Sequence, residues 1–217
     1  MENSNIQLNS NFEPVEQIQL SKHSIYSKVN RLVKKMPVGR VLEIGCGSGR
    51  YLEHLKKQGW EITGIDIQNK DKDFIKVIDV EKGFDLEEKF DLILAVEVIE
   101  HLVDTDFFLQ NLSKHLKENG ILIISTPNLL FWLNRFVMFA GFKPFFAYAD
   151  FHVRMFIWKD LRGKLTTHFA VVKLIGSHVG VGKNRNLLLG MMAAKIGDYL
   201  PRLSAHFIVK LQHINRN

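Results

Sequence analysis

Residues 41–49 read VLEIGCGSG, an apolar run that breaks into three alternating glycines. A second apolar run, ITGID at residues 62–66, follows one helix length later. Glycine adopts the backbone angles of a sharp strand-to-helix turn and lets the backbone approach a ligand closely. Asp66, at the end of the second run, is placed to accept hydrogen bonds from a pair of ribose hydroxyls. The two runs therefore predict a strand, a helix and a second strand that together bind an adenosine-type cofactor.

The spacing of the glycines separates two classes of such cofactor. The dinucleotide fingerprint is Gly-x-Gly-x-x-Gly, which seats a pyrophosphate on the helix N-terminus. Here Gly49 comes one position early, and Glu43 ahead of the glycines suits a cationic ligand better than a phosphate. Residues 43–49 resemble the first motif of the class I S-adenosylmethionine-dependent methyltransferases, which implies S-adenosylmethionine as the cofactor. An ordinary tight strand–helix turn is the alternative.

The composition is typical of one α/β domain. The chain has 217 residues, 46% of them apolar, and its single cysteine, Cys46, excludes a disulfide within the chain. The net charge is +6, but no run of five basic residues occurs, which favours a solvated basic surface over a nucleic-acid or membrane site. The polar, acidic N-terminus lacks the basic and apolar parts of a secretory signal, so we expect a cytoplasmic protein. The sequence implies no stable protein partner.

Apolar runs and helical patterns alternate along the chain, which predicts a doubly wound, Rossmann-like α/β fold with a mostly parallel seven-stranded sheet. Continuous apolar runs such as residues 92–96 suit strands buried on both faces of a parallel sheet. We expect residues 1–20 to form a loose extension and residues 21–217 a single domain. Strands are expected at residues 40–45, 61–66, 75–79, 91–96, 120–125, 169–175 and 205–211, and helices at residues 21–36, 49–58 and 104–117.

One connection is too short for this pattern. Only seven residues lie between Asp66 and Phe74, whereas a parallel crossover usually needs a dozen or more. Methyltransferases of this class generally have a helix there. The sequence leaves two arrangements, a short loop in place of the helix or a displaced third strand.

The cofactor of a doubly wound sheet lies across the carboxyl ends of the central strands. There the glycine turn would contact the methionine part, Asp66 the ribose, and Asp79 the adenine amino group. Asp79 has an alternative role as a helix cap or turn residue. The expected cofactor-binding residues are Glu43, Gly45, Gly47, Gly49, Asp66, Asp79, Val96 and Glu97, the last two beside the sulfonium.

Residues 90–102 read FDLILAVEVIEHL and carry a second strong signal. If residues 97–102 are helical, Glu97, Glu100 and His101 share one face, and the two carboxylates need a cation or hydrogen bonds to offset their repulsion. The stretch resembles the fourth-strand region of the ubiquinone-biosynthesis O-methyltransferase group. Small-RNA 2′-O-methyltransferases carry a similar Glu-x-x-Glu-His pattern, with a later histidine, as a metal site. This resemblance implies a metal such as Mg²⁺ at Glu97, Glu100 and His101, with His152 as the candidate fourth ligand.

Two alternatives need no metal. His101 would act as a general base, because the pKa of histidine lies in the working range, or it would be a structural residue. Glu97 would be favoured near a helix N-terminus by the helix dipole alone.

Residues 152–156, HVRMF, resemble the His-x-Arg-x-Phe segment of many small methyltransferases. His152 and Arg154 lie on the same side of an extended backbone. The resemblance implies that His152 orients an acceptor hydroxyl, as a second catalytic histidine, and that Arg154 binds an acidic group. Ordinary polar loop residues are the alternative.

An insertion at residues 128–150 is rich in aromatic residues but too interrupted by polar ones to span a membrane. Three interpretations remain open: a lid over the substrate, an amphipathic patch in peripheral contact with a membrane, or a core-packing insertion. A lid would make Phe131 and Trp132 acceptor-binding residues.

Together these motifs predict an enzyme that transfers a methyl group from S-adenosylmethionine to a hydroxyl of a small molecule. The aromatic insertion favours an apolar acceptor. An RNA 2′-O-methyltransferase with a metal site is the first alternative. A non-catalytic module that only binds S-adenosylmethionine is the second.

Overall fold

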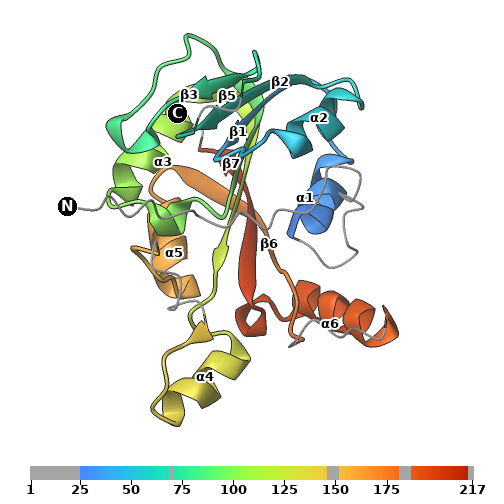
Figure 1. The fold of residues 1–217 in the computed structure, drawn as a ribbon, viewed down its shortest axis with the longest axis vertical. Coiled ribbons are helices and arrows are strands. Elements are labelled where there is room, and N and C mark those ends of the chain that lie inside the picture. The colour runs from blue at the N-terminus through green and yellow to red at the C-terminus, as the bar shows by residue number, and fades with distance from the viewer. Residues whose placement is uncertain (1–24, 69–70, 146–151, 181–186, 215–217) are drawn as a thin grey trace, which may run out of the picture.

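The computed structural model describes residues 25–68, 71–145, 152–180 and 187–214. Seven strands form one sheet in the order β3-β2-β1-β4-β5-β7-β6 (Figure 1). Strands β1 to β5 pair in parallel, and β7 runs antiparallel to both of its neighbours. The mostly parallel seven-stranded fold predicted from the sequence is confirmed. The strands are β1 (Arg40–Ile44), β2 (Glu61–Asp66), β3 (Ile75–Val77), β4 (Phe90–Val96), β5 (Leu116–Pro127), β6 (Phe169–Gly176) and β7 (His206–His213).

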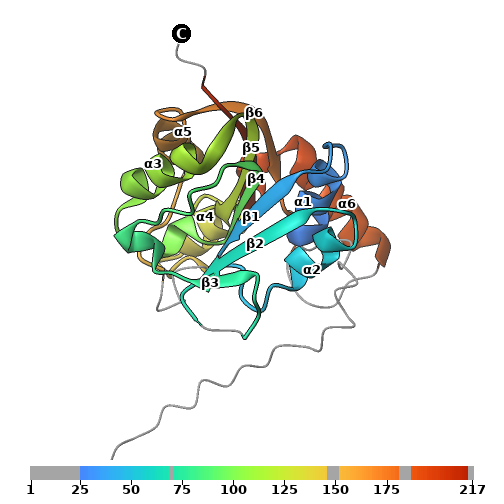
Figure 2. The same ribbon diagram turned by 90° about the horizontal axis from the view of Figure 1, so that it is seen from above.

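Helices cover both faces of the sheet, as Figure 2 shows. On one face, α1 (Ile25–Val33) and α2 (Arg50–Lys56) pack against the sheet, with α6 (Leu187–Tyr199) on the same side. On the other face lie α3 (Thr105–His115) and α5 (Trp158–Leu165). The continuous apolar sequence of β4 follows from this layering, because successive side chains of a strand enter opposite cores.

The order of the strands produces a crevice at one edge of the sheet, where a ligand can bind. The chain moves outward from β1 through β2 to β3 and then crosses to β4 on the other side of β1. Neighbouring crossovers leave the sheet in opposite directions at this point, which opens a crevice at the carboxyl ends of β1 and β4. The glycine turn after β1 and residues 97–102 after β4 both lie at this edge.

The short connection after Asp66 is a loop. Strand β3 pairs in parallel with β2 in regular register, Gly64 opposite Ile75, so the third strand is not displaced. The described residues of the connection, 67–68 and 71–74, form bends and turns without a helix. The first of the two arrangements that the sequence left open is therefore present.

Several predicted boundaries shift. Strand β5 begins directly after α3 and is longer than predicted at both ends. Residues 97–102 do not form a regular helix, and only a 3₁₀ turn, η3 (Ile99–His101), is present. The predicted extension at residues 1–20 lies outside the described residues, and so do residues 146–150 of the insertion.

The described part of the insertion carries α4 (Trp132–Phe139), which extends away from the sheet beyond the end of β5 (Figure 1). Four of its phenylalanines, Phe136, Phe139, Phe142 and Phe145, are exposed, and Phe139 is 93% exposed. The core-packing interpretation therefore fails for these four side chains. None of the helices in the described ranges is long and apolar enough to cross a bilayer.

Candidate functional site

The glycine turn has the geometry that a ligand pocket needs. Gly45, Gly47 and Gly49 all have positive φ, at 66°, 54° and 71°, where other residues are strained. A side chain at Gly49 would also collide with Phe74, whereas the space beside Gly47 is open. The turn is therefore packed against Phe74 at Gly49 and open to a ligand at Gly47.

Asp66 holds this turn in place. Its Oδ2 accepts a hydrogen bond of 2.7 Å from the backbone N–H of Gly47, and its Oδ1 accepts one of 3.0 Å from Gln68. Each carboxylate oxygen has further lone pairs, so the side chain retains capacity to accept hydroxyl donors. The predicted position of Asp66 beside the glycines is therefore present in the structure.

Glu43 lies buried under the turn. Its side chain is 1% exposed, and Oε1 accepts a hydrogen bond of 3.1 Å from the Tyr26 hydroxyl. Its other oxygen, Oε2, has no partner among the described residues. Burial raises the pKa of Glu43 to about 8, which the Tyr26 hydrogen bond only partly opposes. A buried acid with an unused oxygen suits a cation better than a phosphate.

Lys72 is a residue of the site that sequence analysis missed. Its Nζ donates to the carbonyl of Ser48 at 2.8 Å and pairs with Glu53 at 2.6 Å. The short loop after β2 therefore fastens the glycine turn in place of the usual helix. The sequence showed that the loop is short, but it did not show that Lys72 in this loop contacts Ser48 and Glu53.

Asp79 is a helix cap in the structure. Its Oδ1 accepts from the backbone N–H of Glu81 at 3.2 Å, at the start of the 3₁₀ turn η2 (Val80–Lys82), and its Oδ2 pairs with Lys82 at 3.3 Å. The capping role that the sequence left open is thus present, and contact with an adenine amino group stays a prediction.

Glu97 follows Val96 at the end of β4 and does not join a shared helical face. Its φ is 57°, a strained value for a residue with a side chain. Both carboxylate oxygens are occupied: Oε1 accepts from the Ser125 hydroxyl at 2.7 Å, and Oε2 lies 3.2 Å from Nε2 of His206. Because both oxygens already have partners, Glu97 is a poor candidate for a metal ligand, which corrects that part of the expected set.

His206, at the start of β7, was not identified from the sequence. Burial lowers the pKa of this imidazole, and His178 and His152 lower it further, so it is neutral at physiological pH. Its Nδ1 lies 3.0 Å from the Ser177 hydroxyl. A neutral ring that accepts from Ser177 and donates to Glu97 satisfies both neighbours. No motif near residue 206 could have identified this pairing, which depends on β7 lying beside β5.

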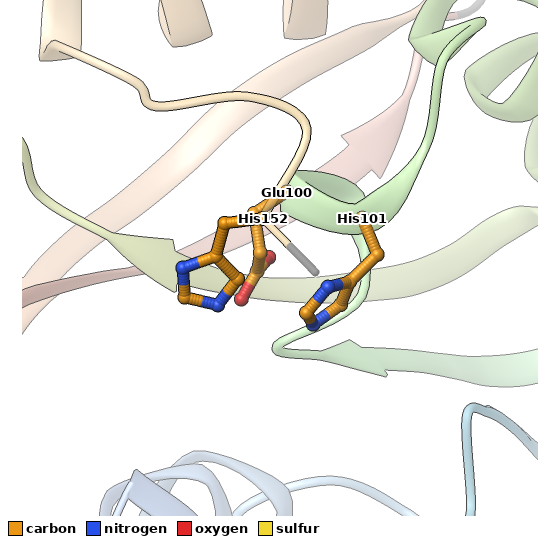
Figure 3. Close-up of side chains that lie close together, drawn as sticks. All are labelled: Glu100, His101 and His152. Carbon is orange, nitrogen blue, oxygen red and sulfur yellow. The ribbon is translucent and has the colours of Figure 1, made fainter. Parts of the chain in front are cut away.

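Glu100, His101 and His152 form the group with the clearest chemical potential. One ligand atom from each lies within 4.8 Å of the other two, and Figure 3 shows the Glu100 carboxylate between the two rings. Glu100 is 1% exposed, and neither carboxylate oxygen has a hydrogen-bond donor of normal geometry among the described residues. Burial raises the pKa of Glu100, although the nearby Thr126 hydroxyl favours the charged form. A cation between these three groups would satisfy the carboxylate.

Backbone pairing brings His152 to this group. The N–H groups of Val153 and Arg154 both donate to the carbonyl of Glu100, at 3.0 Å and 2.9 Å. The Arg154 guanidinium donates to the carbonyls of Leu102, at 3.1 Å, and Val103. Arg154 therefore clamps its segment against η3, and its expected contact with an acidic group of the acceptor stays a prediction.

The two aromatic candidates also pack against the protein. Phe131 is 4% exposed, and the Trp132 indole donates to the carbonyl of Val179 at 2.7 Å. Their rings contact each other edge to face, with centroids 5.9 Å apart. These two residues anchor the base of α4, whereas the exposed phenylalanines of the insertion lie further along the chain.

The glycine turn and the Glu100 group adjoin each other. A side chain at Gly45 would meet Val98 at 2.7 Å, so the backbone of the turn lies directly against the segment that leads into η3. The site therefore combines a turn built for an adenosine-type ligand with a carboxylate and two imidazoles beside it.

Comparison with known proteins agrees with this geometry. A family model described as a methyltransferase domain matches residues 17–166. The chain belongs to this methyltransferase family.

Two curated relatives illustrate the similarity at the sequence level. The ubiquinone biosynthesis O-methyltransferase of Pelagibacter ubique (strain HTCC1062) is 36% identical over 133 residues, which are 54% of this chain and 55% of the relative. The protein of the same name from Bradyrhizobium diazoefficiens is 37% identical over 101 residues, 41% of this chain and 40% of the relative. The chain thus spans about half the length of the curated relatives it matches, or less.

Solved structures share the fold. The N-methyltransferase NodS from Bradyrhizobium japonicum WM9, in complex with S-adenosyl-L-homocysteine, superposes with a TM-score of 0.57 over 94% of this chain and 89% of its own, at 18% identity. An S-adenosylmethionine-dependent methyltransferase from Clostridium acetobutylicum superposes with a TM-score of 0.59 over 91% of this chain and 93% of its own, at 12% identity. At this identity the likeness defines the fold alone, the class I methyltransferase fold.

Proposed function

We propose that this protein is an S-adenosylmethionine-dependent O-methyltransferase that acts on a hydroxyl of a small, apolar molecule. The observation that carries the proposal is the close packing of Val98, two residues before Glu100, against Gly45 of the glycine turn, which places the Glu100, His101 and His152 group near the turn. It unites a nucleoside pocket with side chains able to accept a hydroxyl proton.

Bound S-adenosylmethionine supplies an electrophilic methyl group on a positively charged sulfur. Asp66 accepts hydrogen bonds from the ribose hydroxyls, and the open face of Gly47 lets the backbone approach the ligand. Glu43 balances the positive charge of the amino-acid part once its carboxyl is ionised. Alignment of an acceptor with the methyl group is worth on the order of 7–11 kcal/mol in well-oriented systems.

The acceptor hydroxyl must lose its proton. His101 and His152 are suited to accept it, since an imidazole works as a general base near neutral pH. Glu97, held by Ser125 and His206, is a positioning residue that keeps the end of β4 in its strained conformation.

As the alternative to direct base catalysis by the imidazoles, we propose that Glu100, His101 and His152 hold a divalent metal, because an imidazole bound to a metal has no lone pair left to accept the proton. The buried Glu100 carboxylate without a hydrogen-bond donor of normal geometry supports this, because a buried charge needs a counter-charge. Two imidazoles and one carboxylate suit Zn²⁺, Mn²⁺ or Fe²⁺ better than Mg²⁺, which prefers an all-oxygen set. Such a metal would lower the pKa of a hydroxyl placed against it.

The acceptor class follows from two observations. The curated relatives are named for ubiquinone biosynthesis, and the insertion of this chain exposes Phe136, Phe139, Phe142 and Phe145. We propose a hydroxyl on an apolar precursor of a quinone as the acceptor, with residues 128–145 as its aromatic cover.

Peripheral contact with a lipid surface is a second proposal, favoured by the same exposed phenylalanines. Arg135 and Lys143 accompany them in the sequence and would face anionic head groups. Sedimentation of the protein with vesicles tests it, and recovery in the supernatant with every lipid composition would exclude it.

The decisive experiment is mass-spectrometric detection of a methylated product. Purified protein is incubated with S-adenosylmethionine carrying a labelled methyl group and a panel of quinol precursors, other phenols and RNA. Label in a small phenolic product supports the proposal. Label in RNA would favour the 2′-O-methyltransferase alternative, and binding of S-adenosylmethionine with no product would favour a non-catalytic module. Metal content, measured by elemental mass spectrometry in the protein and in Glu100→Gln, tests the metal without reference to activity.

A further inference from the structure

A cavity of about 780 Å³ lies between the base of α4, one side of α5 and the 3₁₀ turn η5 (Pro201–Leu203). The charged residues that line it are all cations: Arg135, Lys159, Arg162 and Arg202. None of the residues assigned above to cofactor, metal or catalysis lines this cavity.

Nothing in the described part of the chain neutralises these cations. Lys159 and Arg162 lie on one face of α5 through their three-residue spacing, and Asp160 is not among the lining residues. The side chains of Lys159, Arg162 and Arg202 make no hydrogen bond or ion pair with any residue that the structure describes. Arg135 uses its Nε to donate to the Leu130 carbonyl at 3.0 Å, and its terminal nitrogens remain available.

Other cavities of similar size differ in this respect. A cavity of about 710 Å³ beside α3 has three lysines, Lys82, Lys89 and Lys114, but also three acids, Asp85, Glu87 and Glu88. A cavity of about 900 Å³ beside α1 contains Asp198, which pairs with Lys28 and Arg31. The lining of each of these two cavities therefore includes at least one carboxylate, although Lys35, Lys173, Lys195 and Lys210 of the second have no ion pair within the described residues. The lining of the cavity at α5 has no carboxylate.

The floor of the cavity is apolar and held rigidly. Trp158 and the buried Phe207 line it, with ring centroids 5.7 Å apart. Asn128, at the end of β5, donates to the carbonyls of Arg202 and Ser204 at 3.1 Å and 2.8 Å and so fixes η5 beside the cavity. An anion placed against an apolar floor is partly removed from water, which strengthens its attraction to the surrounding cations.

We propose that this cavity is a binding site for a phosphate-type anion, separate from the methyl-transfer site. Three guanidinium groups match such a ligand, since each can donate two parallel hydrogen bonds to phosphate oxygens. Binding would also relieve the repulsion among four uncompensated positive charges. The segment 152–157 joins His152 to the cavity and spans at most about 17 Å, so a ligand there would lie near the acceptor site.

Calorimetric titration tests the proposal. The whole protein is titrated with inorganic phosphate and with pyrophosphate, each against chloride at equal ionic strength. We expect binding that weakens as salt rises, with pyrophosphate tighter than phosphate. The double variant Arg162→Gln/Arg202→Gln should lose at least about tenfold in affinity. Lys159→Gln should weaken binding, and the matched control Lys114→Gln, another exposed helix lysine, should not.

Vesicles distinguish the source of the anion. Co-sedimentation with phosphatidylcholine vesicles, with and without phosphatidylglycerol, is measured for the protein and for the arginine double variant. Binding of free phosphate that the double variant loses supports a soluble ligand. Binding only to phosphatidylglycerol vesicles, also lost in the double variant, supports a lipid head group. Absence of both, or equal binding by the folded double variant, would overturn the proposal. Because these readouts involve no methyl transfer, they stand or fall independently of the proposed enzymatic activity.

Discussion

The imidazole rings of His101 and His152 lie with their centroids 4.9 Å apart, although the two residues belong to distant parts of the sequence. The carbonyl of Glu100 accepts hydrogen bonds from both Val153 and Arg154, which sets the second histidine beside the first. A short extended segment and a 3₁₀ turn thus build the centre of the site together.

Arg154→Ala should lower the free energy of unfolding by about 1–2 kcal/mol, because the carbonyls of Leu102 and Val103 lose a charged donor. It should also reduce metal retention, since His152 loses the clamp beside it. Chemical denaturation and elemental mass spectrometry measure the two effects. Arg162→Ala, an exposed arginine without a partner among the described residues, is the control and should change stability by less than about 0.5 kcal/mol. Equal effects from both variants would contradict the clamp.

His101→Ala and His152→Ala should each reduce turnover by about 10²- to 10⁴-fold while leaving the affinity for S-adenosylmethionine almost unchanged. The reason is that both imidazoles are proposed to act on the acceptor proton rather than on the cofactor. Rates with the labelled methyl donor and calorimetric affinities provide the two readouts. His168→Ala serves as the control, because His168 precedes β6 and so lies at the edge of the sheet opposite to the carboxyl ends of β1 and β4. Wild-type rates in both variants would leave the pair a structural role only.

Asp66→Ala should weaken the binding of S-adenosylmethionine by about 10- to 100-fold, the loss expected for two hydrogen bonds to the ribose. Part of the loss arises because the N–H of Gly47 also loses its acceptor. Calorimetry with S-adenosylhomocysteine measures the affinity without turnover. Asp85→Ala, whose carboxylate is 86% exposed, is the control. If the Asp66 variant binds as tightly as the wild type, the ribose assignment is wrong.

The raised pKa of Glu43, about 8, predicts that the cofactor binds more tightly as pH rises towards that value. A positively charged ligand favours the ionised carboxyl, so its binding must release the proton that Glu43 carries at lower pH. The affinity therefore falls by up to about tenfold for each pH unit below the pKa. Affinities of the wild type and of Glu43→Gln are compared at each pH, so that titration of the ligand's own amino group cancels. A wild-type profile parallel to that of the variant would contradict the assignment.

The same carboxyl predicts a stability effect in the ligand-free protein. A folded-state pKa above the ordinary 4.5 means that the neutral form is favoured by folding, so its contribution is complete below 4.5 and is lost as pH rises through about 8. Glu43→Gln removes this loss and retains an oxygen acceptor for Tyr26. The variant should therefore gain thermal stability relative to the wild type above pH 8 and gain little near pH 4.5. Thermal unfolding followed by circular dichroism measures both, and a pH-independent difference would argue against burial of a titrating carboxyl.

Phe139→Ser combined with Phe142→Ser should leave thermal stability nearly unchanged, because these side chains are 93% and 67% exposed. The same double variant should raise the KM for an apolar acceptor and weaken association with lipid vesicles. Val77→Ser, at an exposed apolar position on the edge strand β3, is the control. A loss of stability would instead indicate that the phenylalanines pack against the protein.

The sequence predicted the sheet and the cofactor edge because both depend on local pattern. Continuous apolar runs specify buried parallel strands, and the three glycines specify a turn that other residues adopt only with strain. The same reasoning placed Asp66 at the end of the second strand, and the structure adds its hydrogen bond to Gly47. The metal set was only partly predicted: Glu100, His101 and His152 come together, whereas Glu97 is held by Ser125 and His206.

These departures share a physical cause. The helical face expected for residues 97–102 assumed a regular helix, but a left-handed residue at Glu97 turns the chain after β4 and redirects that side chain towards β7. The turn depends on the hydrogen-bond partners that the neighbouring strands β5 and β7 provide for Glu97. A short sequence motif does not specify those partners.

By itself, then, the sequence determined the layered α/β fold, the glycine turn and the family resemblance, since each rests on the periodicity and spacing of residues near one another in the chain. Only the tertiary structure decided which distant groups meet: His152 with Glu100, His206 with Glu97, and Lys72 with the turn at Ser48. Contacts of this kind depend on strand order and on the course of the loops. Hydrogen bonds and ion pairs need their atoms within a few ångströms of each other, and the spacing of residues in the sequence does not determine such distances between remote segments.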